Sequence, residues 1–349
     1  MDSSDEHNSS DYSYFTETKI KNFEQQLING KNSFYQIFIF KNDDIIGRTF
    51  GSIIIISQYG EKKIAINEII HNQKDSITSM ILLKNEELLY CAHSRIYCIN
   101  FKKNNYEYDV INEIRLDLKS NSEIYQFLQM KDEKIICSTN SIYYMIIQKT
   151  KNGYYQIILN IIDGRVINHG IYELNNYIIF INQNLNIQFT DKINFSYVNS
   201  INLSKYLKDM KENIEFRKKL CLNNIIMGIN DNIIAVPTLG NGILIINIIN
   251  FVIIKKIINI DFTCWTKLKD GSFITCEYSD NKNIIRMEQW DINENGKDWN
   301  LISKLDCIHN DFVYSICSSD NNNKIYTASN DNKLKCWEIH TYSYFNDDD

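Results

Sequence analysis

Short runs of apolar and polar residues alternate along most of the chain, and clusters of Asn, Asp and Lys separate them. The runs are rich in Ile, Tyr, Phe, Thr and Val, which favour β-strands. One stretch differs, because Leu203, Leu207, Met210 and Ile214 would share one face of a helix. The pattern predicts an all-β sandwich, barrel or propeller, with a short helical insertion at about 203–218.

The strand pattern repeats along the chain. The stretches that begin at Asp75, Asp261 and Asp311 each contain an acidic start, a strand, a polar turn and a second strand, and a third strand follows. In the last two, Thr275 and Thr327 fall at the same place within the second strand. Repeats of roughly 40 to 50 residues are typical of propeller blades. Seven units can be traced, at 33–68, 75–118, 122–160, 163–203, 218–258, 262–304 and 310–340. We therefore predict a single β-propeller with seven four-stranded blades.

The last unit shows only three clear strands. Residues 18–29 resemble the fourth strands of other units, so we expect an N-terminal strand within them to complete the last blade. Such closure would remove an open sheet edge. The predicted organisation is a disordered acidic tail at 1–17, a propeller at 18–340 and an acidic tail at 341–349.

Residues 308–339 resemble one WD40 repeat. The residues at the characteristic positions of that family are His309, Thr327, Asp331 and Trp337, with spacings of 18, four and six residues. The resemblance implies a hydrogen-bonded tetrad that stabilises the blade and has no catalytic role. Buried polar side chains of these kinds can satisfy one another in this way.

The resemblance has clear departures. Ile308 replaces the usual Gly, and Glu338 replaces the Asp of the Trp-Asp pair. Trp290-Asp291 keeps the dipeptide, but no His precedes it within its unit. We therefore expect one intact repeat near the C-terminus, while the other units keep the strand pattern and lack the tetrad.

Charge and cysteine content narrow the functional classes. A net charge of -6 argues against direct binding of nucleic acid through a basic surface. The nine cysteines form no Cys-x-x-Cys pair, which predicts no zinc site and a reducing intracellular compartment, most simply the cytoplasm. The longest apolar stretch, 242–258, is interrupted by Asn247, Asn250 and a lysine pair, so no transmembrane segment is expected.

Sequence signatures of catalysis are absent. The chain has no Gly-x-Ser-x-Gly elbow, P-loop, dinucleotide fingerprint or His-Glu-x-x-His motif, and its six histidines are dispersed. We expect no catalytic residues, no metal and no cofactor. The predicted function is a non-catalytic scaffold for protein–protein interactions in an intracellular complex. The alternative of an enzyme with its site at the mouth of the propeller channel stays open.

Acidic residues precede the first strands of five units. They are Asp75, Glu123, Asp163, Asp261 and Asp311. Together they would form a partial acidic ring at the channel mouth, suited to an Arg- or Lys-containing peptide. Trp265 and Tyr314 follow at matching positions as candidate aromatic anchors. The alternative is structural, since Asp favours turns and aromatic residues pack between blades.

A second alternative is lipid binding. Arg217, Lys218 and Lys219 follow Phe216 in a segment that faintly resembles the Phe-Arg-Arg-Gly motif of phosphoinositide-binding propellers. The second Arg and the Gly are missing, and the acidic chain lowers the attraction to anionic membranes.

Overall fold

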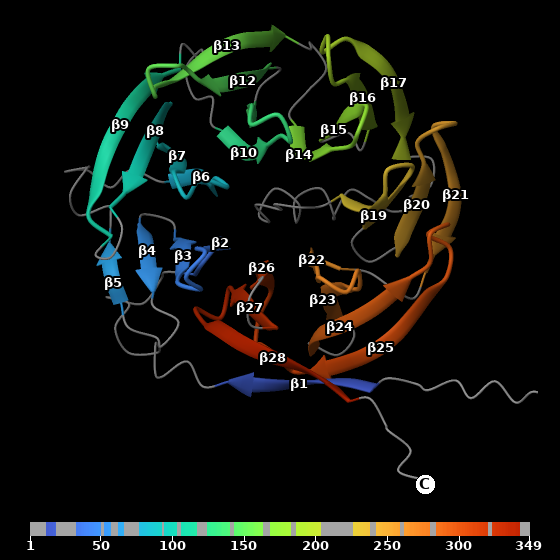
Figure 1. Ribbon diagram of the computed structural model, residues 1–349. Helices are drawn as coiled ribbons and strands as arrows, with labels where there is room; N and C mark the ends of the chain where they lie inside the picture. The colour runs from blue at the N-terminus through green and yellow to red at the C-terminus, as the bar shows by residue number, and fades with distance from the viewer. Residues whose placement is uncertain are drawn as a thin grey trace, which may run out of the picture.

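The computed structural model is a seven-bladed β-propeller (Figure 1). It describes residues 12–18, 33–49, 52–56, 62–65, 77–92, 94–102, 106–116, 124–139, 143–162, 168–182, 186–203, 226–237, 242–258, 262–279, 284–319 and 323–342. No α-helix occurs within these ranges, and therefore none that could cross a membrane.

Each blade is a four-stranded antiparallel sheet whose first strand lies nearest the central axis (Figure 1). Blade 1 contains β2 (Gln36–Ile39), β3 (Ile45–Arg48), β4 (Ile53–Ile56) and β5 (Lys62–Ala65). Blade 2 contains β6 (Ile77–Leu82), β7 (Leu88–Ala92), β8 (Arg95–Phe101) and β9 (Tyr108–Arg115). Blade 3 contains β10 (Ile124–Gln129), β11 (Ile135–Thr139), β12 (Tyr143–Lys149) and β13 (Tyr155–Ile162). Blade 4 contains β14 (Asn168–Glu173), β15 (Tyr177–Asn182), β16 (Asn186–Asp191) and β17 (Tyr197–Asn202).

The remaining blades follow the same order. Blade 5 contains β18 (Met227–Asn230), β19 (Ile233–Pro237), β20 (Ile243–Asn247) and β21 (Val252–Ile257). Blade 6 contains β22 (Cys264–Lys267), β23 (Phe273–Ser279), β24 (Ile284–Ile292) and β25 (Trp299–Asp306). Blade 7 contains β26 (Val313–Ser318), β27 (Lys324–Ser329), β28 (Leu334–Tyr342) and β1 (Tyr12–Thr18). The predicted fold class, the number of blades and the seven units are confirmed.

The N-terminal closure is confirmed, but its strand lies earlier than expected. β1 pairs with β28 from Tyr12 opposite Tyr342 to Thr18 opposite Cys336. We expected the closing strand within residues 18–29. The strand lies at Tyr12–Thr18 instead, and residues 19–29 lie outside the described part of the chain. The segment 12–18 is built mostly of Tyr, Phe and Thr, which favour strands more than the Lys, Asn and Gln that follow. Residues 12–17 and 341–342 therefore belong to the sheet instead of the predicted tails.

The predicted helix at about 203–218 lies almost entirely outside the described residues. Of that segment the structure describes only Leu203, which is buried in the apolar cluster between blades 4 and 5.

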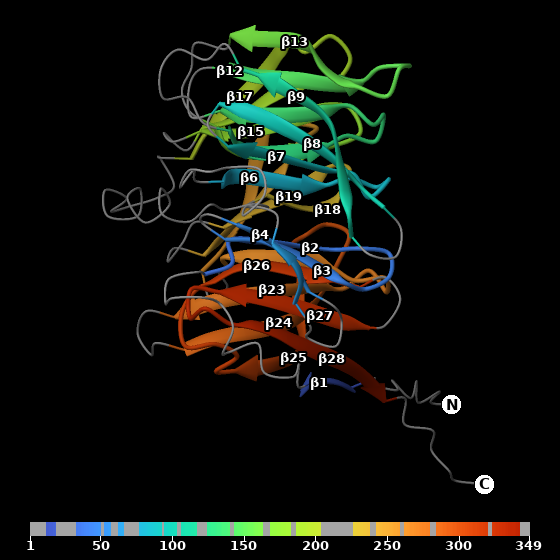
Figure 2. The ribbon, with the colours of Figure 1, turned by 90° about the vertical axis from the view of Figure 1, so that its left-hand side faces the viewer.

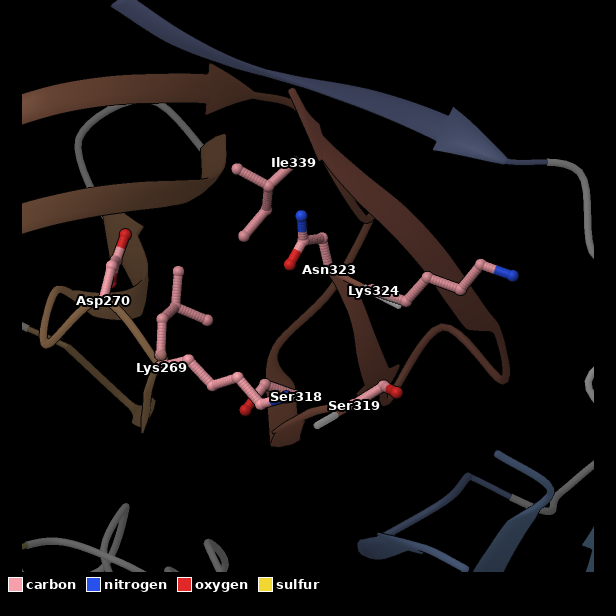
Figure 3. A pocket seen from close by; sticks show the side chains of 8 residues that line it. Lys269, Asp270, Ser318, Ser319, Asn323, Lys324 and Ile339 are labelled. Carbon is pink, nitrogen blue, oxygen red and sulfur yellow. The ribbon is translucent and has the colours of Figure 1, made fainter. Parts of the chain in front are cut away.

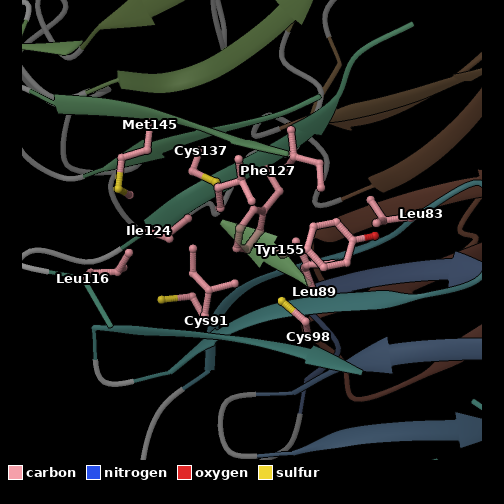
Figure 4. Packing of buried hydrophobic residues seen from close by; sticks show 13 residues of the cluster. Leu83, Leu89, Cys91, Cys98, Leu116, Ile124, Phe127, Cys137, Met145 and Tyr155 are labelled. Atoms are coloured by element: carbon pink, nitrogen blue, oxygen red, sulfur yellow. The ribbon is translucent and has the colours of Figure 1, made fainter. Parts of the chain in front are cut away.

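Apolar side chains fill the spaces between neighbouring blades. Between blades 2 and 3, Leu89 and Cys98 face Phe127 and Cys137, and all four are buried (Figure 4). The cysteines here are free thiols that pack as small apolar side chains. Burial of both faces of a blade explains why the inner strands contain long apolar runs, while the outer strands alternate.

A β-bulge recurs in the outer strand of blades 1 to 6. At the same place in each register, one residue of the fourth strand has no direct partner on the third. These residues are Lys63, Ile111, Ile158, Val198, Ile254 and Ile302. Bulges twist an exposed edge away from regular pairing and so limit edge-to-edge aggregation.

Candidate functional site

The propeller has two faces, which lie at opposite ends of the strands (Figure 2). We call the end where the first strands begin the entry face; the turns between second and third strands lie there too. We call the other end the hairpin face; the turns between first and second strands and between third and fourth strands lie there. Asp311 comes just before β26, so it belongs to the entry face.

Four side chains of blade 7 form a continuous hydrogen-bonded chain near the entry face. His309 Nδ1 lies 3.1 and 3.0 Å from the two carboxylate oxygens of Asp331, and His309 Nε2 lies 2.8 Å from Thr327 Oγ1. Trp337 Nε1 donates to the same Thr327 oxygen at 2.9 Å. A carboxylate only accepts, so His309 Nδ1 carries the proton. In the neutral ring Nε2 then accepts from the Thr327 hydroxyl.

Asp331 joins this chain to the backbone of two loops. Its carboxylate accepts from the Asn310 N–H and the Lys333 N–H, each at 3.0 Å. Burial raises the pKa of Asp331, but the hydrogen bonds from His309 and from these two N–H groups outweigh it and hold the pKa below its usual value. The carboxylate therefore stays ionised and ties the loop before β26 to the turn after β27.

Blade 6 retains half of the same arrangement. Trp290 Nε1 donates to Thr275 Oγ1 at 3.0 Å, and both side chains are buried. In both blades, the residue opposite the Thr lies two positions before the Trp. The expectation that only one unit keeps this chemistry therefore needs correction for the Thr–Trp pair. The sequence separation hides it, because longer stretches of the second and third strands place Thr275 and Trp290 farther apart along the chain than Thr327 and Trp337.

Most of the predicted acidic ring lies outside the described residues. These are Asp75, Glu123, Asp163 and Asp261, and the candidate lipid ligands Arg217, Lys218 and Lys219 also lie outside them. Asp311 is described and is partly exposed at the entry face. One of its oxygens accepts from the Phe312 N–H at 2.7 Å, and the other accepts from Asn330 Nδ2 at 2.6 Å. Asp311 thus stabilises its loop, and its partly exposed carboxylate has the capacity to accept further hydrogen bonds.

Tyr314 lies beside Asp311 and links blade 7 to blade 1. Its hydroxyl donates to Asn330 Oδ1 at 2.9 Å, and its ring centroid lies 5.0 Å from that of Tyr35. The Arg48 guanidinium lies 5.2 Å from the centroid of Tyr35. The entry face therefore carries a cluster of Asp311, Tyr314, Asn330 and Tyr35 between blades 7 and 1. Sequence reasoning missed Tyr35 and Asn330, because no local pattern places them next to Tyr314.

Trp265 has a different environment from Tyr314. It is only 9 % exposed and packs with Phe262 and Phe273 in the apolar cluster between blades 5 and 6. The centroids of Trp265 and Phe273 lie 6.0 Å apart. The structure therefore gives Trp265 the blade-packing role and does not bring it to the cluster at the entry face.

No group of three or more potential metal-ligating side chains occurs in the part of the chain that the structure describes. Comparison with protein-family models gives no match, and a search of curated proteins finds no significant relative.

Proposed function

We propose that this chain is a divergent WD40-type propeller and serves as a non-catalytic protein-interaction scaffold in an intracellular complex. The hydrogen-bonded chain of His309, Thr327, Asp331 and Trp337 supports the WD40 assignment, because these residue types follow the pattern of that family's repeat. The Thr275–Trp290 pair extends the resemblance to a second blade. A closed ring of blades offers a rigid platform on which loops can bind other proteins.

The observation that carries the proposal is the cluster at the entry face between blades 7 and 1. Asp311 supplies a negative charge held in place by two hydrogen bonds. The Tyr314 and Tyr35 rings supply an ordered aromatic surface next to it. A carboxylate beside aromatic rings suits an Arg or Lys side chain, which can pair with the charge while its stem or guanidinium packs on a ring. We therefore infer that the partners present basic segments.

The test is affinity purification of the tagged protein from its own cells, followed by mass spectrometry. Asp311→Lys reverses the charge in the cluster, and Glu133→Lys makes the same change at an exposed turn of the hairpin face as the control. We expect partners that remain with Glu133→Lys and disappear with Asp311→Lys. Retention of every partner by Asp311→Lys would exclude this cluster as the binding site. The absence of any stoichiometric partner of the unmodified protein would contradict the scaffold function itself.

A further inference from the structure

A pocket of about 220 Å³ lies on the hairpin face between blades 6 and 7 (Figure 3). Its lining comes from the turn between β22 and β23, from the facing ends of β26 and β27, and from β28. The residues are Leu268, Lys269, Asp270, Ser318, Ser319, Asn323, Lys324 and Ile339. The pocket is thus at the opposite end of the blades from Asp311 and Tyr314, and it does not depend on the function proposed for the entry face.

Hydrogen bonds from three blades hold the walls of the pocket in place. Ser318 Oγ lies 3.2 Å from Thr266 Oγ1 and donates to the Lys267 carbonyl at 3.3 Å, which connects blade 7 to blade 6. The Ser319 hydroxyl donates to the Asp43 carboxylate at 2.5 Å, which connects blade 7 to blade 1. The pocket is therefore formed before any ligand binds, and binding loses less conformational entropy.

Hydrogen-bond donors predominate in the lining. Lys269 and Lys324 carry ammonium groups and Asn323 carries an amide, and none of these three side chains has a polar partner within the described ranges. Figure 3 shows the Lys269 side chain reaching towards Ser318, while Lys324 extends outwards from the rim. These groups would favour an anionic ligand that enters beside Lys269 and meets Lys324 at the edge.

In the described part of the chain, Asp270 is the carboxylate that lines the pocket, and its own turn already binds it. Asp270 Oδ1 accepts from the Ser272 N–H at 2.8 Å and from the Ser272 hydroxyl at 2.7 Å. Among the described residues, the lining thus contains two lysines and one aspartate, and Oδ1 of the aspartate is bound within its turn. The balance of charge favours a negative ligand over a positive one.

The hairpin face continues this distribution of charge beyond the pocket. The second residue after the first strand is an exposed lysine in four blades: Lys41, Lys84, Lys131 and Lys269. In the same turns of blades 1 and 2, three acidic residues are buried: Asp43, Asp44 and Glu87. Asp43 binds Ser319, Asp44 accepts from a tyrosine hydroxyl, and Glu87 pairs with a lysine. The first turns of blades 1 and 2 therefore expose a lysine, while these three carboxylates are buried beneath the surface.

We propose that this pocket binds the carboxylate side chains of the chain's own C-terminal acidic segment. A partner protein with an acidic segment is the other source of this chemistry, and the test distinguishes the two. Tyr12 pairs with Tyr342, so β1 begins and β28 ends at the hairpin face, where Ile339 of β28 lines the pocket. The chain continues from Tyr342 with Ser-Tyr-Phe-Asn-Asp-Asp-Asp. Asp347 to Asp349 follow Tyr342 by five to seven residues, a reach of roughly 17–25 Å for an extended chain.

The first experiment titrates the full-length protein with a fluorescent peptide of the sequence of residues 343–349 with both ends blocked. A peptide with Asn in place of every Asp is the matched ligand. We expect the acidic peptide to bind and the Asn peptide not to bind. The double variant Lys269→Gln, Lys324→Gln should weaken binding by about five- to tenfold, the effect of two partly exposed ion pairs. Lys297→Gln removes a lysine from the hairpin face outside the pocket and should leave binding unchanged.

Equal binding of the two peptides, or equal weakening by Lys297→Gln, would overturn the proposal. An unchanged affinity in the double variant would also overturn it. The same holds if the acidic peptide binds neither the unmodified protein nor the C-terminal variant described next.

A further variant distinguishes the two sources. In the full chain, Asp347→Asn, Asp348→Asn and Asp349→Asn remove the negative charge of the C-terminal segment. If that segment occupies the pocket, the added acidic peptide will bind the variant more tightly than it binds the unmodified protein. If the affinity is the same, the pocket is open to a partner, and Lys269→Gln with Lys324→Gln should then remove a protein from the affinity purification that Asp311→Lys retains.

Discussion

At the residue scale, Thr327 is the side chain of blade 7 that connects His309 with Trp337. Its hydroxyl donates to His309 Nε2, and its oxygen accepts from Trp337 Nε1, so one buried side chain satisfies two others. Thr275 in blade 6 is equally buried but satisfies only Trp290. An unsatisfied buried polar group lowers stability by about 1–3 kcal/mol. The two threonines therefore form a natural matched pair.

We expect Thr327→Val to lower the free energy of unfolding more than Thr275→Val. Valine keeps the shape of the side chain and removes the hydroxyl. This takes the partner from His309 Nε2 and Trp337 Nε1 in one case, and from Trp290 Nε1 alone in the other. The difference should be on the order of 1–3 kcal/mol, since one extra buried group loses its partner. Urea unfolding followed by tryptophan fluorescence measures it. Equal losses in the two variants would contradict the shared role of Thr327.

A residue of these sites could be predicted only when its partners lie close to it in the sequence. His309, Thr327, Asp331 and Trp337 lie within one unit, so their spacing could be compared with a known repeat. Tyr35 and Tyr314 are brought together only by closure of the ring, and no pattern in either segment specifies that contact. The sequence matched Trp265 with Tyr314, but this was wrong: Trp265 lies opposite Thr275 as Ile316 lies opposite Thr327. Trp265 is therefore the counterpart of Ile316 and packs in the apolar cluster between blades 5 and 6.

A buried carboxyl group in blade 6 gives the protein a distinct dependence on pH. Burial, and then the charge of Glu277, raise the pKa of Glu288 to about 7, although Arg286 and Lys304 act in the opposite direction. Arg286 itself donates from Nε to Asp306 at 2.6 Å. The unfolded chain loses this proton near pH 4.5, whereas the folded chain keeps it up to about pH 7. Stability from this group therefore falls as the pH rises through that interval.

We expect Glu288→Gln to stabilise the protein at pH 8 and to have no stabilising effect at pH 4. An amide occupies the same space and does not ionise, so the variant avoids the burial of a charge. The gain at pH 8 should be on the order of 1–2 kcal/mol, once screening by Arg286 and Lys304 is allowed for. Urea midpoints at the two pH values provide the measurement, with exposed Glu294→Gln as the control. A gain of equal size at both pH values would exclude ionisation as the cause.

At the element scale, side chains link the first turns of neighbouring blades. The Lys41 N–H donates to Glu86 at 2.8 Å, and the Lys84 N–H donates to Gln129 at 2.9 Å. The Lys131 N–H donates to Glu173 at 2.9 Å. Each acceptor belongs to the next blade, so the turns of blades 1 to 4 form a connected series around the channel. The strand pattern predicted the blades, but these links depend on the angle between adjacent blades, which no strand encodes by itself.

The link between blades 3 and 4 can be tested at Glu173. Its carboxylate also pairs with Lys192, whose side chain is only 16 % exposed. Glu173→Ala leaves both donors without this acceptor and should lower stability by about 1–3 kcal/mol. Glu173→Gln keeps an acceptor for the Lys131 N–H, so it should cost less. Differential scanning calorimetry measures both, with exposed Glu133→Ala as the control from the same turn as Lys131. A loss with Glu133→Ala as large as that with Glu173→Ala would contradict the link.

At the scale of the whole molecule, the ring depends on one strand from the other end of the chain. Blades 1 to 6 are each built from consecutive strands, whereas blade 7 takes three strands from the C-terminal region and β1 from the N-terminal region. β1 therefore joins the two ends of the sequence, and its loss would expose the long outer edge of β28. An exposed edge of this kind invites pairing with another chain.

Two N-terminal truncations test whether stability depends on β1, which closes the ring, or on the acidic segment that precedes β1. Removal of residues 1–18 deletes β1 and its seven pairs with β28, each worth about 0.2–1 kcal/mol. The protein should then unfold at a clearly lower urea concentration and scatter more light, as open edges associate. Removal of residues 1–11 leaves all seven pairs and should preserve the midpoint. If both truncated proteins unfold like the full chain and stay monomeric, β1 does not hold the propeller closed. If the shorter truncation alone is already destabilising, residues before Tyr12 contribute to closure, and the boundary at Tyr12 would have to move.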